Sequence, residues 1–126
     1  MERYHPAHRK NNKDMEHSFN TDIAKEYGIE EAIIIKAFVD MIMDSMYNCY
    51  PPHSLFQKEY WVTIGVSALE KLFPYIKQLR CKIDRLVAIG IIKTAPCPVF
   101  GKVGRRPNWY TFTERGWEML EDFHVI

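Results

Sequence analysis

The sequence lacks any long apolar run. None of its stretches reaches the roughly 18 consecutive apolar residues that a membrane-spanning helix requires. The first 18 residues are polar and contain no apolar stretch of the kind found in a secretory signal peptide. We therefore expect a cytoplasmic protein that makes no contact with a membrane.

Cysteine is also scarce. Cys49, Cys81 and Cys97 are odd in number, lie far apart and lack the paired Cys or His spacing of a structural zinc site. Free thiols are the ordinary state of cysteines in a reducing compartment. The sequence therefore predicts three free thiols, no bound metal and no cofactor.

Catalytic signatures are missing as well. The chain has no Walker-type phosphate loop, no G-x-S-x-G and no H-E-x-x-H. Glu30 and Glu31 are adjacent in the sequence, so we do not expect them to share a helix face as a working carboxylate pair. These absences predict a protein that is not an enzyme.

Positive charge, by contrast, is concentrated in one segment. Between Lys71 and Trp109 the chain has nine Lys or Arg residues and one acid, Asp84, which gives this segment a net charge of +8. The whole chain carries only +1, so the remainder must carry −7. Clustered basic residues of this kind are typical of a surface that binds phosphates.

The apolar pattern predicts one domain at residues 19–126, preceded by a flexible polar tail at residues 1–18. A short helix is expected up to Tyr27, with Asn20 or Thr21 as its N-cap. Gly28 is expected to end this helix, with Ile29 as the apolar residue that packs against that end.

Residues 30–47 are predicted to form an unusually apolar helix. Its only polar stripe consists of Lys36, Asp40 and Asp44. Such a helix is either central in the core or buries a second face against a partner subunit. Both the core position and a homodimer contact through 30–47 remain open at this point.

The rest of the chain predicts helices joined by tight turns and followed by a hairpin. The expected elements are a loop at 49–58, a short β run at 59–63, a helix capped by Thr63 and ended by Pro74, a helix at 75–89 ended by Gly90, strands at 91–95 and 109–113 around a loop at 96–107, and a closing helix capped by Thr113. This order predicts an α+β, mostly α, winged helix-turn-helix with two extra N-terminal helices and a small antiparallel β-hairpin wing.

The helix at 75–89 is the expected recognition helix. If Leu79, Ile83 and Leu86 face the core, the geometry of an α-helix turns the opposite face outward. A helix fits the major groove, and a basic hairpin tip suits phosphate contacts. The predicted DNA-binding residues are Lys77, Gln78, Arg80, Cys81, Lys82 and Arg85 on the helix, with Lys102, Arg105 and Arg106 on the wing.

Four segments resemble a known family: FNTDIAKEYGIEEAI at 19–33, YWVT at 60–63, LFP at 72–74 and NWYTFTERG at 108–116. They are similar to the winged-helix domain of phage and mobile-element replication proteins, namely the N-terminal domain of DnaD-like primosome proteins and replisome organisers. The resemblance implies double-stranded DNA binding in replication initiation, other replication proteins as partners, and self-association through the N-terminal helices. In this family the turn before the recognition helix is usually about two residues longer than the turn expected after Pro74.

Two other functions fit the same pattern. One is a transcriptional regulator that uses the same winged-helix surface. The other is a winged helix that binds an acidic protein partner and no DNA.

Overall fold

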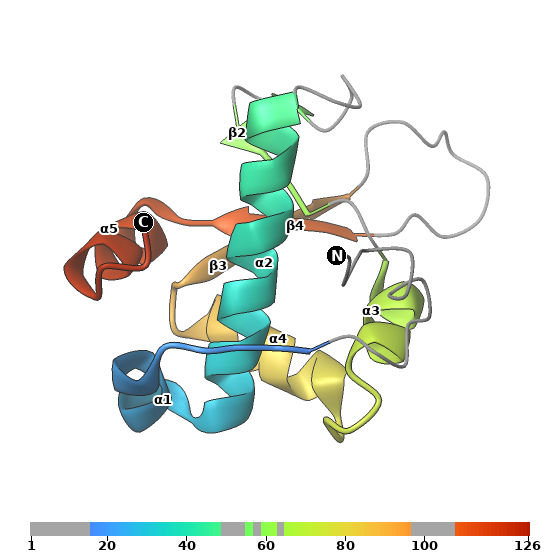
Figure 1. Cartoon of the computed structure of the whole chain (residues 1–126). Helices are drawn as coiled ribbons and strands as arrows, with labels where there is room; N and C mark the ends of the chain where they lie inside the picture. Colours follow the sequence, from blue (N-terminus) through green and yellow to red (C-terminus); the bar gives the residue numbers. More distant parts are fainter. Residues whose placement is uncertain (1–15, 49–54, 57–58, 63–64, 97–107) are drawn as a thin grey trace, which may run out of the picture.

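The computed structural model describes residues 16–48, 55–56, 59–62, 65–96 and 108–126 (Figure 1). These residues form a mostly helical α+β fold, and none of their helices is long and apolar enough to cross a bilayer. The α+β, mostly α class expected from the sequence is therefore confirmed. The elements are α1 (Thr21–Tyr27), α2 (Ile29–Asn48), β1 (Leu55–Phe56), β2 (Glu59–Tyr60), α3 (Val66–Leu72), α4 (Leu79–Ala88), β3 (Ile92–Pro96), β4 (Asn108–Phe112) and α5 (Glu114–Asp122).

The corner between α1 and α2 forms as its sequence predicts. The side chain of Asn20 caps α1 by accepting hydrogen bonds from the backbone N–H groups of Asp22 and Ile23. Gly28 ends the helix with φ of 112°, a conformation that side chains with a Cβ rarely adopt. The expected packing of Ile29 was wrong: this residue is 58% exposed, because α2 begins directly after Gly28 and turns its first side chain outward.

Helix α2 runs through the middle of the molecule (Figure 1) and supplies much of its core. The expected central position is confirmed, because its apolar residues are buried on nearly every side. Of the predicted polar stripe, Lys36 and Asp40 form an ion pair at 2.7 Å. The buried apolar residues of α2 are Ala32, Ile33, Ile34, Ile35, Phe38, Val39 and Ile42.

The turn between α3 and α4 is longer than the sequence pattern predicted. The helix expected from Tyr75 begins only at Leu79, after a turn in which Gln78 adopts left-handed backbone angles (φ 56°, ψ 47°). Ile76 explains the difference, because its buried side chain fixes the turn and its N–H donates to the carbonyl of Phe73. Helix α3 has Gly65 as its N-cap, whereas the predicted cap, Thr63, lies outside the described residues.

The described residues form two small antiparallel sheets. Strands β3 and β4 pair from Ile92 opposite Phe112 to Pro96 opposite Asn108. Val62 joins this sheet through two backbone hydrogen bonds with Tyr110, at 2.6 and 3.1 Å. The second sheet corrects the expectation of a loop throughout 49–58, because Leu55–Phe56 pairs with Glu59–Tyr60. The alternation of polar and apolar residues is too short there to predict a two-residue strand.

Helix α5 is held against the end of the hairpin. Thr113 caps it, as expected: its Oγ1 accepts from the N–H of Gly116 and donates to the carbonyl of Gly90. A Cβ at position 116 would collide with the carbonyl oxygen of Ile91, so glycine permits this close approach. Leu120 is fully buried and anchors the helix to the core.

Candidate nucleic-acid interface

The predicted orientation of α4 is confirmed. Leu79, Ile83 and Leu86 are buried, and the residues on the opposite side of the helix are exposed. Its outward end begins with the last two residues of the preceding turn, Lys77 and Gln78, and continues into the first helical turn. We define the α4 basic surface as Lys77, Gln78 and Arg80, all of which are exposed.

The backbone at the start of α4 adds to the positive character of this surface. Gln78 is the N-cap, yet its side chain makes no capping hydrogen bond, and the first turn contains no acidic residue. The first N–H groups of a helix lack partners within the helix and form the positive end of its dipole. Such an end attracts phosphate groups when cationic side chains flank it.

Neither Lys77 nor Arg80 has a salt bridge within the part of the chain that the structure describes. Lys71 is a third exposed cation, in the last turn of α3 and therefore close to the turn along the chain. It belongs to the basic segment, but its helix does not carry the sequence pattern of a recognition helix. Asp84, one helical turn beyond Arg80, is exposed too and opposes phosphate binding on that part of the helix.

Two of the predicted DNA-binding cations instead contact the protein itself. The guanidinium of Arg85 donates to Glu31, with 2.7 Å between Nη1 and Oε2. Lys82 lies 3.1 Å from a carboxylate oxygen of Glu30 and 3.9 Å from one of Glu31. One long lysine side chain from another helix therefore reaches both Glu30 and Glu31.

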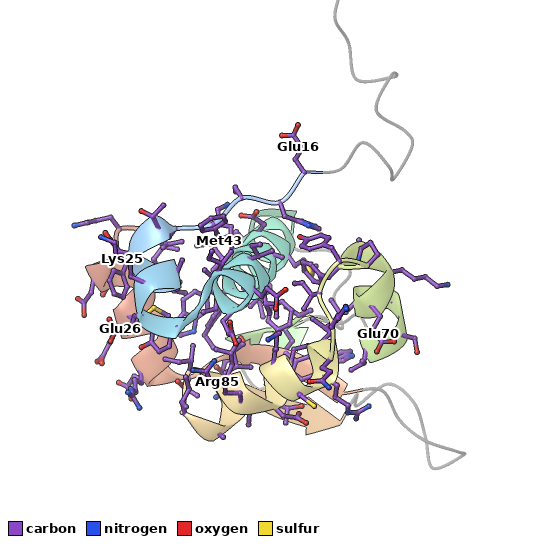
Figure 2. All side chains as sticks on the ribbon, turned by 90° about the horizontal axis from the view of Figure 1, so that it is seen from below. Glu16, Lys25, Glu26, Met43, Glu70 and Arg85 are labelled. Carbon is purple, nitrogen blue, oxygen red and sulfur yellow. The ribbon has the colours of Figure 1, made fainter. Side chains whose placement is uncertain are left out.

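The Glu31 carboxylate is the centre of this contact. Its side chain is only 8% exposed, and it occupies space that a Cβ on Gly28 would fill. Arg85 also donates to the carbonyl oxygen of Tyr27 at 3.3 Å, so it joins α4 to the end of α1 as well as to α2. In Figure 2, Arg85 lies between α4 and the α1–α2 corner. We define these four side chains (Glu30, Glu31, Lys82, Arg85) as the interhelical ion cluster.

The interhelical ion cluster joins α4 to α2. A carboxylate that is almost fully buried needs a charged or hydrogen-bonding partner, because its desolvation is costly. No local pattern in the sequence indicates this pairing, because Glu31 and Arg85 are 54 positions apart. Arg85 and Lys82 thus differ from Lys77 and Arg80, although all four come from the same basic segment.

Tyr75 occupies the turn beside the α4 basic surface. Its hydroxyl lies 2.5 Å from Nδ1 of His17, whose ring also packs on Phe73 with 4.7 Å between centroids. Burial raises the pKa of the Tyr75 hydroxyl above its ordinary value, and the negative charge of Glu30 raises it further. The negative charge of Glu30 therefore acts on the turn before α4.

The remaining predicted site residues are Cys81 and the three cations of the expected wing. Cys81 is exposed and has a free thiol, whereas Lys102, Arg105 and Arg106 lie outside the described residues. No group of three His, Cys, Asp or Glu side chains suited to a metal ion occurs in the described ranges. Comparison of the chain with protein-family models, with curated proteins and with solved structures gave no match.

Proposed function

We propose that the protein is a non-catalytic, double-stranded DNA-binding domain of the winged helix-turn-helix type. The N-terminal end of α4 enters the major groove. The basic wing predicted at 96–107, of which 97–107 lie outside the described residues, contacts the phosphate backbone. The observation that carries the proposal is the α4 basic surface, where two cations without an ion pair among the described residues flank a helix start that has no side-chain cap.

The order of the elements supports the winged-helix assignment. A long helix (α2) is followed by a short strand contact at Val62, two helices joined by a turn, and a hairpin. Val62 pairs with β4 as the first strand of a winged-helix sheet pairs with the last. In this arrangement the second helix of the pair, α4, is the one that docks in the groove.

The dimensions and charges of α4 also favour this docking. A helix with its side chains is about 10–12 Å across, and the major groove is about 12 Å wide. Lys77 and Arg80 are placed for phosphate contacts, and Gln78 is of the residue type that reads adenine through two hydrogen bonds. Lys82 and Arg85 act indirectly, because the interhelical ion cluster sets the orientation of α4.

The resemblance of the sequence supports a role in the replication initiation of a phage or mobile element, with replication proteins as partners. Location of the bound site at a replication origin or at a promoter distinguishes this role from transcriptional regulation. A homodimer through α2 has less support, because most of its described apolar residues are already buried within one copy.

The test is a fluorescence-anisotropy titration of a mixed-sequence duplex at several salt concentrations. We expect binding that weakens with salt, and a slope shallower by about 1.8 in the variant Lys77→Ala plus Arg80→Ala, because about 0.9 is lost per phosphate contact. The matched control is Lys25→Ala plus Lys36→Ala, which changes the net charge equally. Lys25 projects from α1 on the side of the molecule away from α3 (Figure 2).

Two outcomes would count against the proposal. Absence of duplex binding at low salt would exclude DNA as the ligand and favour an acidic protein partner. An equal loss of duplex binding in the test and control variants would show that binding depends on net charge alone and not on the position of the cations on α4.

A further inference from the structure

A second charged surface lies on α5, across the molecule from α3 (Figure 1). Glu114, Glu118 and Glu121 are exposed and follow one another at spacings of four and three, so they form one line along the helix. Within the described part of the chain, none of the three has a salt bridge. This side of the protein is therefore strongly acidic, whereas the α4 basic surface is cationic.

These glutamates border a groove of about 570 Å³ between α5 and strands β2 and β3. Trp117 provides part of its apolar lining and is fixed by Phe112, with 5.1 Å between ring centroids. The cation in the lining, Lys93, is paired with Glu59 at 2.7 Å and is thereby neutralised. The groove thus combines uncompensated carboxylates with an aromatic ring, the combination that suits lysine and arginine side chains.

We propose that this acidic groove docks the α4 basic surface of a second copy of the chain. The two surfaces have opposite charge. Lys77 and Arg80 on one surface, and the three α5 glutamates on the other, lack ion-pair partners in the described residues of a single copy. They lie on different sides of the molecule, so one copy does not satisfy its own groove. Contact between two unlike surfaces is heterologous, and it extends into open chains unless the rotation closes a ring.

This self-docking goes beyond the proposed function but uses the same basic surface. A duplex and a neighbouring copy therefore compete for Lys77 and Arg80. DNA phosphates displace the groove carboxylates, so DNA separates the copies. In the absence of DNA, assembly keeps the α4 basic surface covered. Because the attraction is between exposed charges, it weakens with salt as the screening length falls from about 30 Å at 0.01 M to about 8 Å at 0.15 M.

A charge-swap experiment on the full chain tests the proposal by sedimentation velocity at low salt without DNA. One variant carries Glu118→Lys plus Glu121→Lys in the groove, and the other carries Lys77→Glu plus Arg80→Glu. We expect wild type to associate with increasing concentration and each variant alone to associate about tenfold more weakly, equivalent to about 1.4 kcal/mol. An equimolar mixture should regain association, because the intact groove of one variant meets the intact basic surface of the other, and the two reversed surfaces also have opposite charge.

The control variant Glu16→Lys plus Glu26→Lys makes the same charge change as the groove variant, on the N-terminal segment and α1. Circular dichroism verifies that every variant is folded. The proposal is overturned if wild type stays monomeric, if the mixture stays monomeric, or if the control loses association as the groove variant does. It is also overturned if saturating duplex leaves the wild-type assembly intact.

The design separates this proposal from DNA binding. The groove variant should still bind duplex, since its α4 basic surface is unchanged. A wild type that stays monomeric but binds duplex normally rejects self-docking alone. Association of the two mixed variants, together with a wild type that binds no duplex, rejects the DNA-binding function alone.

Discussion

The same basic segment supplies two pairs of cations with different surroundings. Lys77 and Arg80 are exposed at the start of α4 and have no ion pair among the described residues. Lys82 and Arg85, less than two helical turns further on, are held by Glu30 and Glu31 of α2. The comparison teaches that cations of one basic segment differ in their partners: carboxylates of the same fold pair with Lys82 and Arg85, whereas none among the described residues pairs with Lys77 or Arg80.

The largest expected effect is that of Arg85→Ala on folding stability. The variant should lower the free energy of unfolding by about 2 kcal/mol, because it removes the closest partner of a nearly buried carboxylate. Lys82, at 3.9 Å from Glu31, compensates only in part. Urea denaturation measures the change. Arg80→Ala is the matched control and should stay within about 0.5 kcal/mol of wild type. Similar losses in both variants would remove the distinction between the two pairs.

For duplex binding we expect the larger effect from Arg80→Ala and the smaller one from Arg85→Ala. Arg80→Ala should weaken binding about fivefold and make the salt slope shallower by about 0.9, the value for one lost phosphate contact. Arg85→Ala should leave the slope unchanged when measured at a temperature where the variant is folded. Fluorescence anisotropy on one duplex compares the two. A shallower slope for Arg85→Ala would mean that this guanidinium leaves Glu31 to bind phosphate.

Local signals in the sequence were sufficient for most of the elements. Asn20 and Thr113 cap their helices as predicted, and the spacing of Leu79, Ile83 and Leu86 gave the buried face of α4. Each of these features depends on residues within a few positions of one another. Short-range hydrogen bonding and helical periodicity therefore decide them without knowledge of the tertiary fold.

Features that depend on contacts between residues far apart in the sequence could not be predicted from local signals. The start of α4 was predicted four residues too early, because burial of Ile76 and the left-handed backbone of Gln78 are set by packing in the folded protein. The pairing of Arg85 with Glu31 joins residues that no local pattern connects. The buried face of α4 was thus predicted correctly, but local patterns could not divide the cations of its basic segment into those with and those without an ion pair among the described residues.

A substitution of Gln78, in the α4 basic surface, should change the free energy of unfolding by less than Arg85→Ala does and in the opposite direction. A left-handed conformation is unfavourable for a residue with a Cβ, and glycine adopts it without that cost. Gln78→Gly should therefore raise the free energy of unfolding by about 0.5 kcal/mol, since the backbone keeps its φ of 56°. Urea denaturation measures it, with Gln78→Ala as the control that retains the Cβ. If Gln78→Gly is less stable than Gln78→Ala, the strain at this turn is not relieved by glycine.

The smallest expected effect is on the pKa of Tyr75. This pKa reports how far the negative charge of Glu30, in the interhelical ion cluster, extends toward the α4 basic surface. The pKa of Tyr75 is raised by burial and by Glu30, so folding favours its protonated form. The resulting stability is fully present below the unfolded pKa of about 10 and is lost as the pH rises through the higher folded pKa. Tyr75 is 51% exposed, so this contribution is small. Glu30→Gln should lower the Tyr75 pKa, measured by NMR titration of the ring resonance that Tyr75→Phe removes. An unchanged pKa would mean that burial alone sets it and that the charge of Glu30 stops short of the turn, leaving the α4 basic surface electrostatically independent of the interhelical ion cluster.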